Sequence, residues 1–245
     1  MKSRYLIYLT GFLCITLNGA AVAENALPPK KLTLSYQAIK DGKPIATVNE
    51  KLTHDGTNYR IESTAKAKGI YALLGERKLI SIGTINPVGL RPTHFESHLG
   101  GNTKKSLVAD FDWKNLTLSM TRKGKTTTAG LNTGAQDLLS FGYQFMFVNF
   151  ASLKPKQYSV YLTTGKKYKA YKFSVEYPKK SITTQAGQFK TIYLSEVTGS
   201  NTPPSKEIWL GAKNIGSKIY QLPIKLIIRD KSSTIEQVLT SINAE

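Results

Sequence analysis

Apolar and polar residues alternate with a period of two along most of this chain. In the first such segment, one face carries Leu32, Leu34, Tyr36 and Ala38. A second segment puts Tyr59, Ile61, Ser63 and Ala65 on one face. This alternation is typical of half-buried β-strands. Asp41-Gly42 and Asp55-Gly56 are hairpin turn signals at the ends of the intervening segment, so the chain is predicted to open with an antiparallel meander.

The same pattern continues after one apolar interruption. Residues 69–75 break the alternation and predict a short helical turn or an apolar loop. The clearest later strand places Tyr171, Phe173, Val175 and Tyr177 on the face opposite Lys172, Ser174 and Glu176. Further strand-like segments follow the same rule and are separated by Gly, Pro or Asn: 78–86, 90–99, 105–113, 116–122, 181–184, 189–197, 206–210, 224–229 and 234–241.

Residues 134–152 form the exception, because aromatic and aliphatic residues crowd together there. Thr133 is a suitable N-cap, and Asp137 would lie in the first turn, where a carboxylate favours the helix dipole. We predict a buried helix over 134–152. Its aromatic and β-branched residues leave a buried strand as the alternative for the second half. The apolar stretch, 138–150, is too short to span a bilayer.

The predicted fold class is therefore mainly β. We expect a long antiparallel curved sheet or a partly open β-barrel, with one substantial buried helix between its halves. A single β-rich domain would span 31–243, and its halves, 31–130 and 155–243, would be joined by helix 134–152.

The N-terminal segment has the pattern of a secretory signal peptide. Two basic residues precede an apolar run from Tyr5 to Leu17, and Ala21 and Ala23 fit the small-residue rule for cleavage. We expect cleavage after Ala23, export to the periplasm, a linker over 24–30 and no transmembrane span in what remains. The single cysteine, Cys14, lies in the apolar run, so the exported chain is expected to fold without disulfides.

The charge balance is strongly basic. The whole chain has a formal net charge of +18, and loss of residues 1–23, which hold two basic and no acidic residues, leaves +16. The expected compartment argues against a nucleic-acid partner. Lysines occur in scattered pairs, which indicates either solvated strand edges and turns or attraction to an anionic envelope surface.

Two polar clusters could carry chemistry. His94, Glu96 and His98 alternate on one strand face, but the two histidines would be roughly 13 Å apart, too far to share one metal ion without a bulge. Asp110 and Asp112 also share a face, and paired carboxylates can hydrolyse glycosides. A hairpin with Phe111 and Trp113 packed inward explains this motif more simply. We therefore expect no catalytic residues, no metal, no cofactor and no enzyme activity.

The aromatic residues are the better candidates for a binding site. Those that could line an apolar ligand cavity beside a concave sheet are Tyr143, Phe145, Phe147, Phe150 and Trp209. The same residues would also serve in an ordinary core.

Several short motifs recur in an order that resembles a known bacterial family of exported proteins, the domain of unknown function 3108. They are Leu34-Ser35-Tyr36 followed by Asp41-Gly42-Lys43, Gly69-Ile70 to Leu74 leading to Gly89-Leu90-Arg91-Pro92, Asp110-Phe111-Asp112-Trp113, Gln136-Asp137-Leu138-Leu139-Ser140, Gly187-Gln188-Phe189-Lys190-Thr191-Ile192, and Trp209-Leu210 followed by Leu222-Pro223-Ile224. The chain departs from the family at 212–221, where a connection is longer. The resemblance implies a β-rich envelope protein and no established activity.

These observations favour a non-enzymatic periplasmic binding or carrier module for a hydrophobic or lipid-like, anionic envelope ligand. The alternative is an interaction or scaffold protein of envelope assembly, with an envelope protein as its partner. A third and more distant option is an enzyme of cell-wall glycan that uses Asp110 and Asp112.

Overall fold

The protein is a single curved β-sheet, seen in a computed structural model that describes residues 27–100, 106–199, 202–230 and 232–245. The expected signal peptide, 1–23, lies outside these residues. The fifteen described strands are, in chain order, β1 (Lys31–Lys40), β2 (Lys43–His54), β3 (Asn58–Ala67), β4 (Glu76–Asn86), β5 (Gly89–Leu99), β6 (Leu107–Asp112), β7 (Thr117–Arg122), β8 (Lys125–Gly130), β9 (Gln136–Asp137), β10 (Gln157–Thr163), β11 (Tyr168–Thr184), β12 (Gly187–Glu196), β13 (Lys206–Ile215), β14 (Lys218–Arg229) and β15 (Thr234–Ala244).

Strands adjacent in the chain are also neighbours in the sheet. The order is β8-β7-β6-β5-β4-β3-β2-β1-β15-β14-β13-β12-β11-β10-β9, and every described pairing is antiparallel except that of β9 with β10. The pairing of β1 with β15 brings the first and last strands of the chain together in the middle of the sheet. The predicted mainly antiparallel, curved and open sheet is confirmed.

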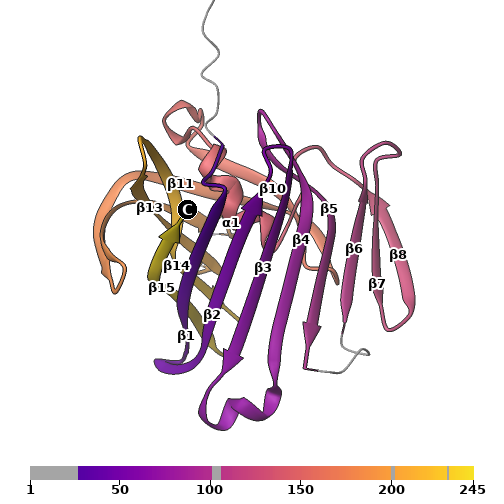
Figure 1. Cartoon of the computed structure of the whole chain (residues 1–245), viewed down its shortest axis with the longest axis horizontal. Helices are drawn as coiled ribbons and strands as arrows, with labels where there is room; N and C mark the ends of the chain where they lie inside the picture. The colour runs from indigo at the N-terminus through magenta and orange to yellow at the C-terminus, as the bar shows by residue number, and fades with distance from the viewer. Residues whose placement is uncertain (1–26, 101–105, 200–201, 231) are drawn as a thin grey trace, which may run out of the picture.

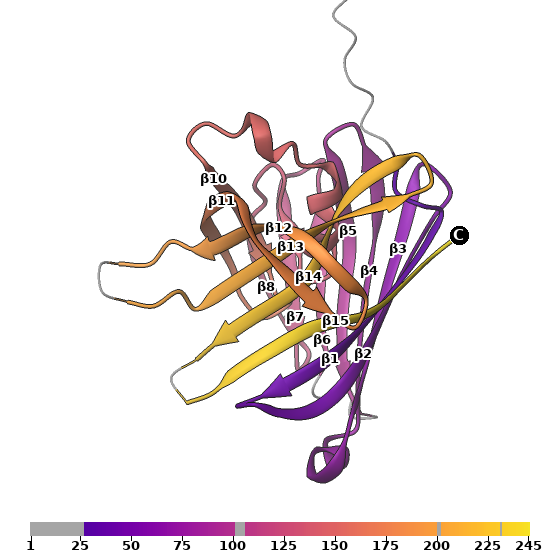
Figure 2. The ribbon, with the colours of Figure 1, turned by 90° about the vertical axis from the view of Figure 1, so that its left-hand side faces the viewer.

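The sheet has two wings, which we define as β1–β8 and β9–β15. Figure 1 shows the first wing as a row of long, nearly parallel ribbons with α1 (Ser140–Gln144) behind it. In Figure 2 the strands of the second wing run obliquely across those of the first. The inner faces of the two wings enclose the core.

Alternation along the strands places the core side chains as predicted. Leu32, Leu34, Tyr36 and Ala38 of β1 are all buried, and the residues between them are not. On β11 the inward residues Tyr171, Phe173 and Val175 are buried, but Tyr177 is exposed. The longer connection at 212–221 extends the hairpin of β13 and β14 as far as the Ile215–Lys218 pair.

The continuous helix predicted over 134–152 is wrong in its extent. The segment contains β9, the five-residue α1, and two 3-10 turns, η3 (Phe145–Phe147) and η4 (Phe150–Ser152). Extended backbone at Val148 and Asn149 separates the two turns, and no strand forms in this half of the segment.

Packing explains why the helix breaks. Phe145 and Phe150 pack in one hydrophobic cluster with β10–β13, whereas Tyr143 and Phe147 pack in the larger cluster built on β1–β7 and β14. A straight helix could not direct alternate aromatic side chains into both clusters, because residues three to four apart lie on the same helix face.

The segment 69–75 contains the predicted short helical turn, the 3-10 helix η1 (Gly69–Leu74) between β3 and β4. None of the helices in the described part of the chain is long and apolar enough to cross a membrane.

Candidate ligand-binding cavity

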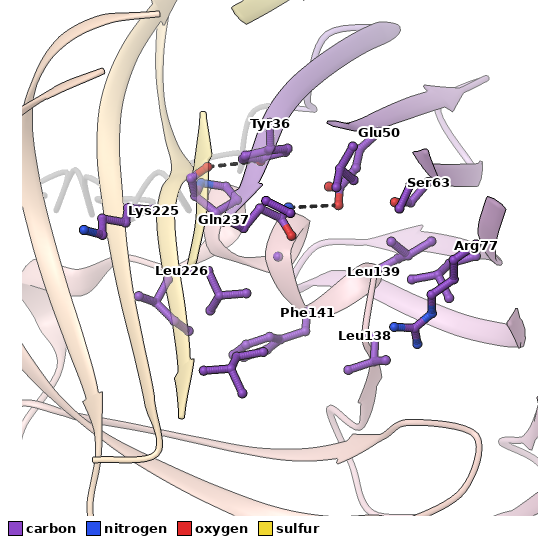
Figure 3. Close-up of a pocket in the computed structure, with 18 of the residues that line it drawn as sticks. Tyr36, Glu50, Ser63, Arg77, Leu138, Leu139, Phe141, Lys225, Leu226 and Gln237 are labelled. Atoms are coloured by element: carbon purple, nitrogen blue, oxygen red, sulfur yellow. Dashed lines mark hydrogen bonds between the residues drawn. The ribbon is translucent and has the colours of Figure 1, made fainter. Parts of the chain in front are cut away.

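A cavity of about 360 Å³ lies between the two wings, bordered by α1. Strands β1–β4 supply one side, β13–β15 supply the other, and the segment 138–145 lies across it (Figure 3). Most of the lining is apolar and includes Val48, Leu79, Leu138, Phe141, Phe145, Ile208 and Leu226. The walls therefore suit an apolar ligand.

Asp137 holds the aromatic side of the cavity in place. Its Oδ1 accepts hydrogen bonds from the backbone N–H groups of Leu139 (2.8 Å) and Ser140 (2.9 Å), which starts α1. Its Oδ2 accepts from the Ser81 hydroxyl of β4 at 2.6 Å. Burial raises the pKa of Asp137 to about 6, although these hydrogen bonds oppose the rise.

The aromatic side itself is a contact between α1, η3 and β11. The ring of Phe141 meets that of Phe145 edge-on at 4.9 Å and stacks on Phe173 at 5.9 Å. Such pairs stabilise a rigid wall.

Glu50 is the unusual polar residue of the lining. Alternation along β2 points it inward between Val48 and Leu52, and its cross-strand neighbours are Leu34 and Ser63. Burial raises the pKa of Glu50 to about 7. Part of its surface remains accessible because it borders the cavity.

The groups around Glu50 are hydroxyls and an amide. Gln237 of β15 donates to Glu50 Oε1 at 3.5 Å (Figure 3). The Tyr36 hydroxyl donates to the Pro223 carbonyl at 3.1 Å. Burial raises the pKa of the Tyr143 hydroxyl, and the nearby Glu50 carboxylate raises it further. The Ser63 and Tyr143 hydroxyls lie close enough to Glu50 to lower its pKa. A ligand hydroxyl or carboxyl would find both donors and acceptors here.

Three cationic side chains also line the cavity. Lys206 pairs with Glu196 at 3.1 Å, and Lys225 pairs with Glu236 at 2.8 Å. Arg77 of β4 makes no ion pair within residues 27–100, 106–199, 202–230 and 232–245. Desolvation lowers the pKa of the Arg77 guanidinium. The side chain is nevertheless exposed, which places it at the cavity entrance.

The residues predicted to bind a ligand occupy different environments. Phe145 lines the cavity, and Tyr143 lies behind it beside Glu50. Phe147 and Phe150 are buried in the two core clusters. Trp209 lies outside the lining, with its ring 4.8 Å from that of Tyr193 and under the ammonium group of Lys225.

The polar motif of β5 lies on the face opposite the core, where Glu96 contacts both histidines, with His94 Nε2 4.0 Å from its Oε2. His94 Nδ1 lies 2.7 Å from Asp110 Oδ1, and His98 Nε2 lies 2.9 Å from Glu96. Within the described residues, no group of three or more His, Cys, Asp or Glu side chains could hold a metal ion.

Asp112 belongs to the hairpin that the sequence predicted. Its Oδ1 accepts hydrogen bonds from the backbone N–H groups of Lys114 and Asn115, and these bonds lower its pKa. Phe111 is buried, and Trp113 Nε1 donates to the Pro92 carbonyl at 2.6 Å. The motif therefore turns the chain from β6 into β7.

Sequence reasoning missed the polar residues of the cavity, above all Glu50 and Arg77. A signal for Glu50 was present, because it interrupts an inward face that otherwise reads Ala46, Val48 and Leu52. Nothing local marked Arg77, which gains its position only when β4 meets the opposite wing.

Comparison with known proteins identifies the family and no activity. No curated protein matches the chain. A family model described as "Protein of unknown function (DUF3108)" matches residues 31–240, which runs from β1 into β15. The chain therefore belongs to the DUF3108 family, as the resemblance predicted.

Proposed function

We propose that the protein is a non-enzymatic binding or carrier module of the bacterial cell envelope, acting in the periplasm on an amphiphile with an apolar chain and an anionic group. The observation that carries the proposal is the apolar cavity with Arg77 at its entrance. A volume of about 360 Å³ falls in the range of about 300 to 1,000 Å³ usual for ligand sites.

The walls supply the affinity in this proposal. Burial of each ligand CH₂ group among Leu138, Phe141 and Leu226 would contribute about 0.8 kcal/mol. Micromolar affinity requires about 8 kcal/mol and immobilising the ligand costs at least about 4 kcal/mol more, so apolar burial alone would need a chain of roughly 15 CH₂ groups. A shorter chain would depend on the polar contacts as well.

The polar side chains supply the selectivity. Arg77 can bind a carboxylate or phosphate with two parallel hydrogen bonds, whereas the charges of Lys206 and Lys225 are balanced by Glu196 and Glu236. Glu50 lies deeper on the same face, and its raised pKa keeps much of it protonated near neutral pH, which limits repulsion of an anionic ligand.

Native mass spectrometry of protein purified from the envelope tests the proposal. We expect extra mass that organic extraction removes. Ala65→Phe, which places a ring in the cavity, should abolish it, whereas Thr64→Phe on the opposite face of β3 should retain it. Unsubstituted protein without added mass, even after incubation with envelope lipids, would contradict the proposal.

The alternative function, a scaffold in envelope assembly, is supported by the open edge at β8. This strand ends the sheet order, and nearly all its residues, Lys125–Gly130, are exposed. Such an edge can pair with a strand from another protein. A photo-crosslinker at Thr128 should then capture an envelope protein reproducibly, and its failure to do so would count against this role.

A further inference from the structure

The turn between β3 and β4 presents apolar side chains to solvent. We call residues 69–74 the apolar tip. Ile70 is 83% exposed and Leu73 is 96% exposed, the two most exposed large hydrophobic residues in the described part of the chain. An exposed apolar pair at the end of a protruding turn is typical of an interaction site.

Backbone hydrogen bonds hold the apolar tip in this shape. Lys68 N–H donates to the Ile45 carbonyl at 2.7 Å, and Gly75 N–H donates to the Ala72 carbonyl at 3.0 Å. The glycines at its two ends, Gly69 and Gly75, have φ of 57° and 75°, which glycine adopts without steric cost. The backbone conformation of the turn therefore keeps Ile70 and Leu73 exposed.

Basic residues surround the apolar tip. Lys66, Lys68, Arg77 and Lys78 lie on its two flanks, and Glu76 is the one acidic residue of that stretch, which leaves a net charge of +3. Glu76 lies 3.9 Å from Lys66 and 3.3 Å from Lys78. Lys68 and Arg77 make no ion pair with another described residue, so this end of the molecule is complementary to an anionic surface.

The apolar tip lies at the end of the sheet where the cavity opens. It connects β3 and β4, the strands that carry the lining residues Ala65 and Arg77. Figures 1 and 2 show η1 projecting beyond the ends of the neighbouring strands, on the side of the β1–β2 hairpin.

We infer that the apolar tip docks the protein on an anionic lipid bilayer. Ile70 and Leu73 would enter the boundary between headgroups and acyl chains, while Lys66, Lys68 and Lys78 contact lipid phosphates. This role goes beyond ligand binding and does not depend on it. In combination with the cavity, it would bring the entrance at Arg77 close to the lipid surface.

Vesicle flotation tests this inference. Protein should float with vesicles of phosphatidylcholine and phosphatidylglycerol, and much less with phosphatidylcholine alone. Ile70→Ser with Leu73→Ser should weaken binding at least about tenfold, because two apolar side chains no longer enter the lipid. The matched control is Val88→Ser, since Val88 is 75% exposed in the turn at the opposite end of β4 and should not matter.

A second measurement keeps folding separate from binding. Leu73→Trp should give a blue-shifted emission on adding the anionic vesicles, and Val88→Trp should not. No binding by unsubstituted protein, or equal losses in the two serine variants, would overturn the inference. If the unsubstituted protein is a dimer and the Ile70→Ser, Leu73→Ser variant is a monomer, the apolar tip would instead bind a second copy of the chain. Cavity ligand seen by native mass spectrometry should persist in this variant, so the two proposals can fail separately.

Discussion

Two carboxylates, Asp137 and Glu50, point into the interior of the same sheet, and their surroundings differ. Asp137 is fully buried and accepts three hydrogen bonds from Ser81, Leu139 and Ser140. Glu50 borders an apolar cavity, and its polar contacts are with side chains only: Gln237 donates at 3.5 Å, and the Ser63 and Tyr143 hydroxyls lie close enough to lower its pKa. Burial raises the pKa of both.

The difference separates a structural role from a binding role. A buried carboxylate whose hydrogen bonds are satisfied by its own chain stabilises one local conformation. A carboxylate that is held by side chains alone and lines a cavity is the more typical candidate for contact with a ligand.

The largest expected effect is the loss of stability when Asp137, the structural carboxylate, is replaced. Asp137→Ala leaves two buried N–H groups without an acceptor and removes one of the two partners of the Ser81 hydroxyl, the other being the Tyr59 hydroxyl, so the free energy of unfolding should fall by about 3 to 5 kcal/mol. Asp137→Asn keeps an acceptor oxygen and should lose about half as much. Urea unfolding measures the stability of both Asp137 variants. A loss below about 1 kcal/mol for Asp137→Ala would contradict the structural role assigned to Asp137.

Glu50→Gln should stabilise the protein at neutral and higher pH, in contrast to the loss expected for Asp137→Ala. The folded-state pKa of Glu50, about 7, lies above its ordinary 4.5, so the folded protein binds more protons than the unfolded chain between these values. Stability therefore falls as pH rises from about 4.5 to 7, by at most about 3 kcal/mol.

The glutamine variant should lack that contribution and be the more stable protein above pH 7. Urea unfolding between pH 4.5 and 8 measures the difference, and Glu62→Gln, in an exposed pair with Arg60, is the matched control. An unchanged pH slope in the Glu50 variant would show that Glu50 is solvated from the cavity.

Arg77→Met should reduce affinity for an acidic amphiphile about tenfold, the usual size of one charge-assisted contact, and should leave affinity for the uncharged alcohol of equal chain length unchanged. Titration calorimetry with the two ligands measures this. Lys78→Met, on the outer face of β4, should affect neither ligand. Equal loss for both ligands would mean that Arg77 shapes the cavity instead of selecting charge.

The smallest effect is expected at Asp110, an exposed carboxylate beside His94. Asp110→Asn should change stability by less than about 0.5 kcal/mol, because solvent screens exposed pairs. Thermal unfolding at neutral pH checks this. A loss of stability comparable to that of Asp137→Ala would mean that burial does not explain why a carboxylate is important for stability.

Strand positions were predictable where one face is buried. The alternation of Leu32, Leu34 and Tyr36 could be interpreted directly, whereas β8, Lys125–Gly130, escaped prediction because it is exposed on both faces and carries no apolar alternation. The helix predicted over 134–152 was wrong for the opposite reason. Apolar residues dominate this segment, so no periodicity indicates where the chain changes direction.

The sequence by itself determined the fold class, the antiparallel character of the sheet and the family, because period-two burial, turn residues and short motifs are local properties. Only the tertiary structure decided where the two wings meet, and with it the cavity. Glu50 and Arg77 lie far apart in the chain from Lys206 and Lys225, and the β1–β15 pairing, a non-local contact, brings them together. A binding site made by curvature has no local sequence signal, because each strand contributes one or two side chains that alone look like ordinary core or surface.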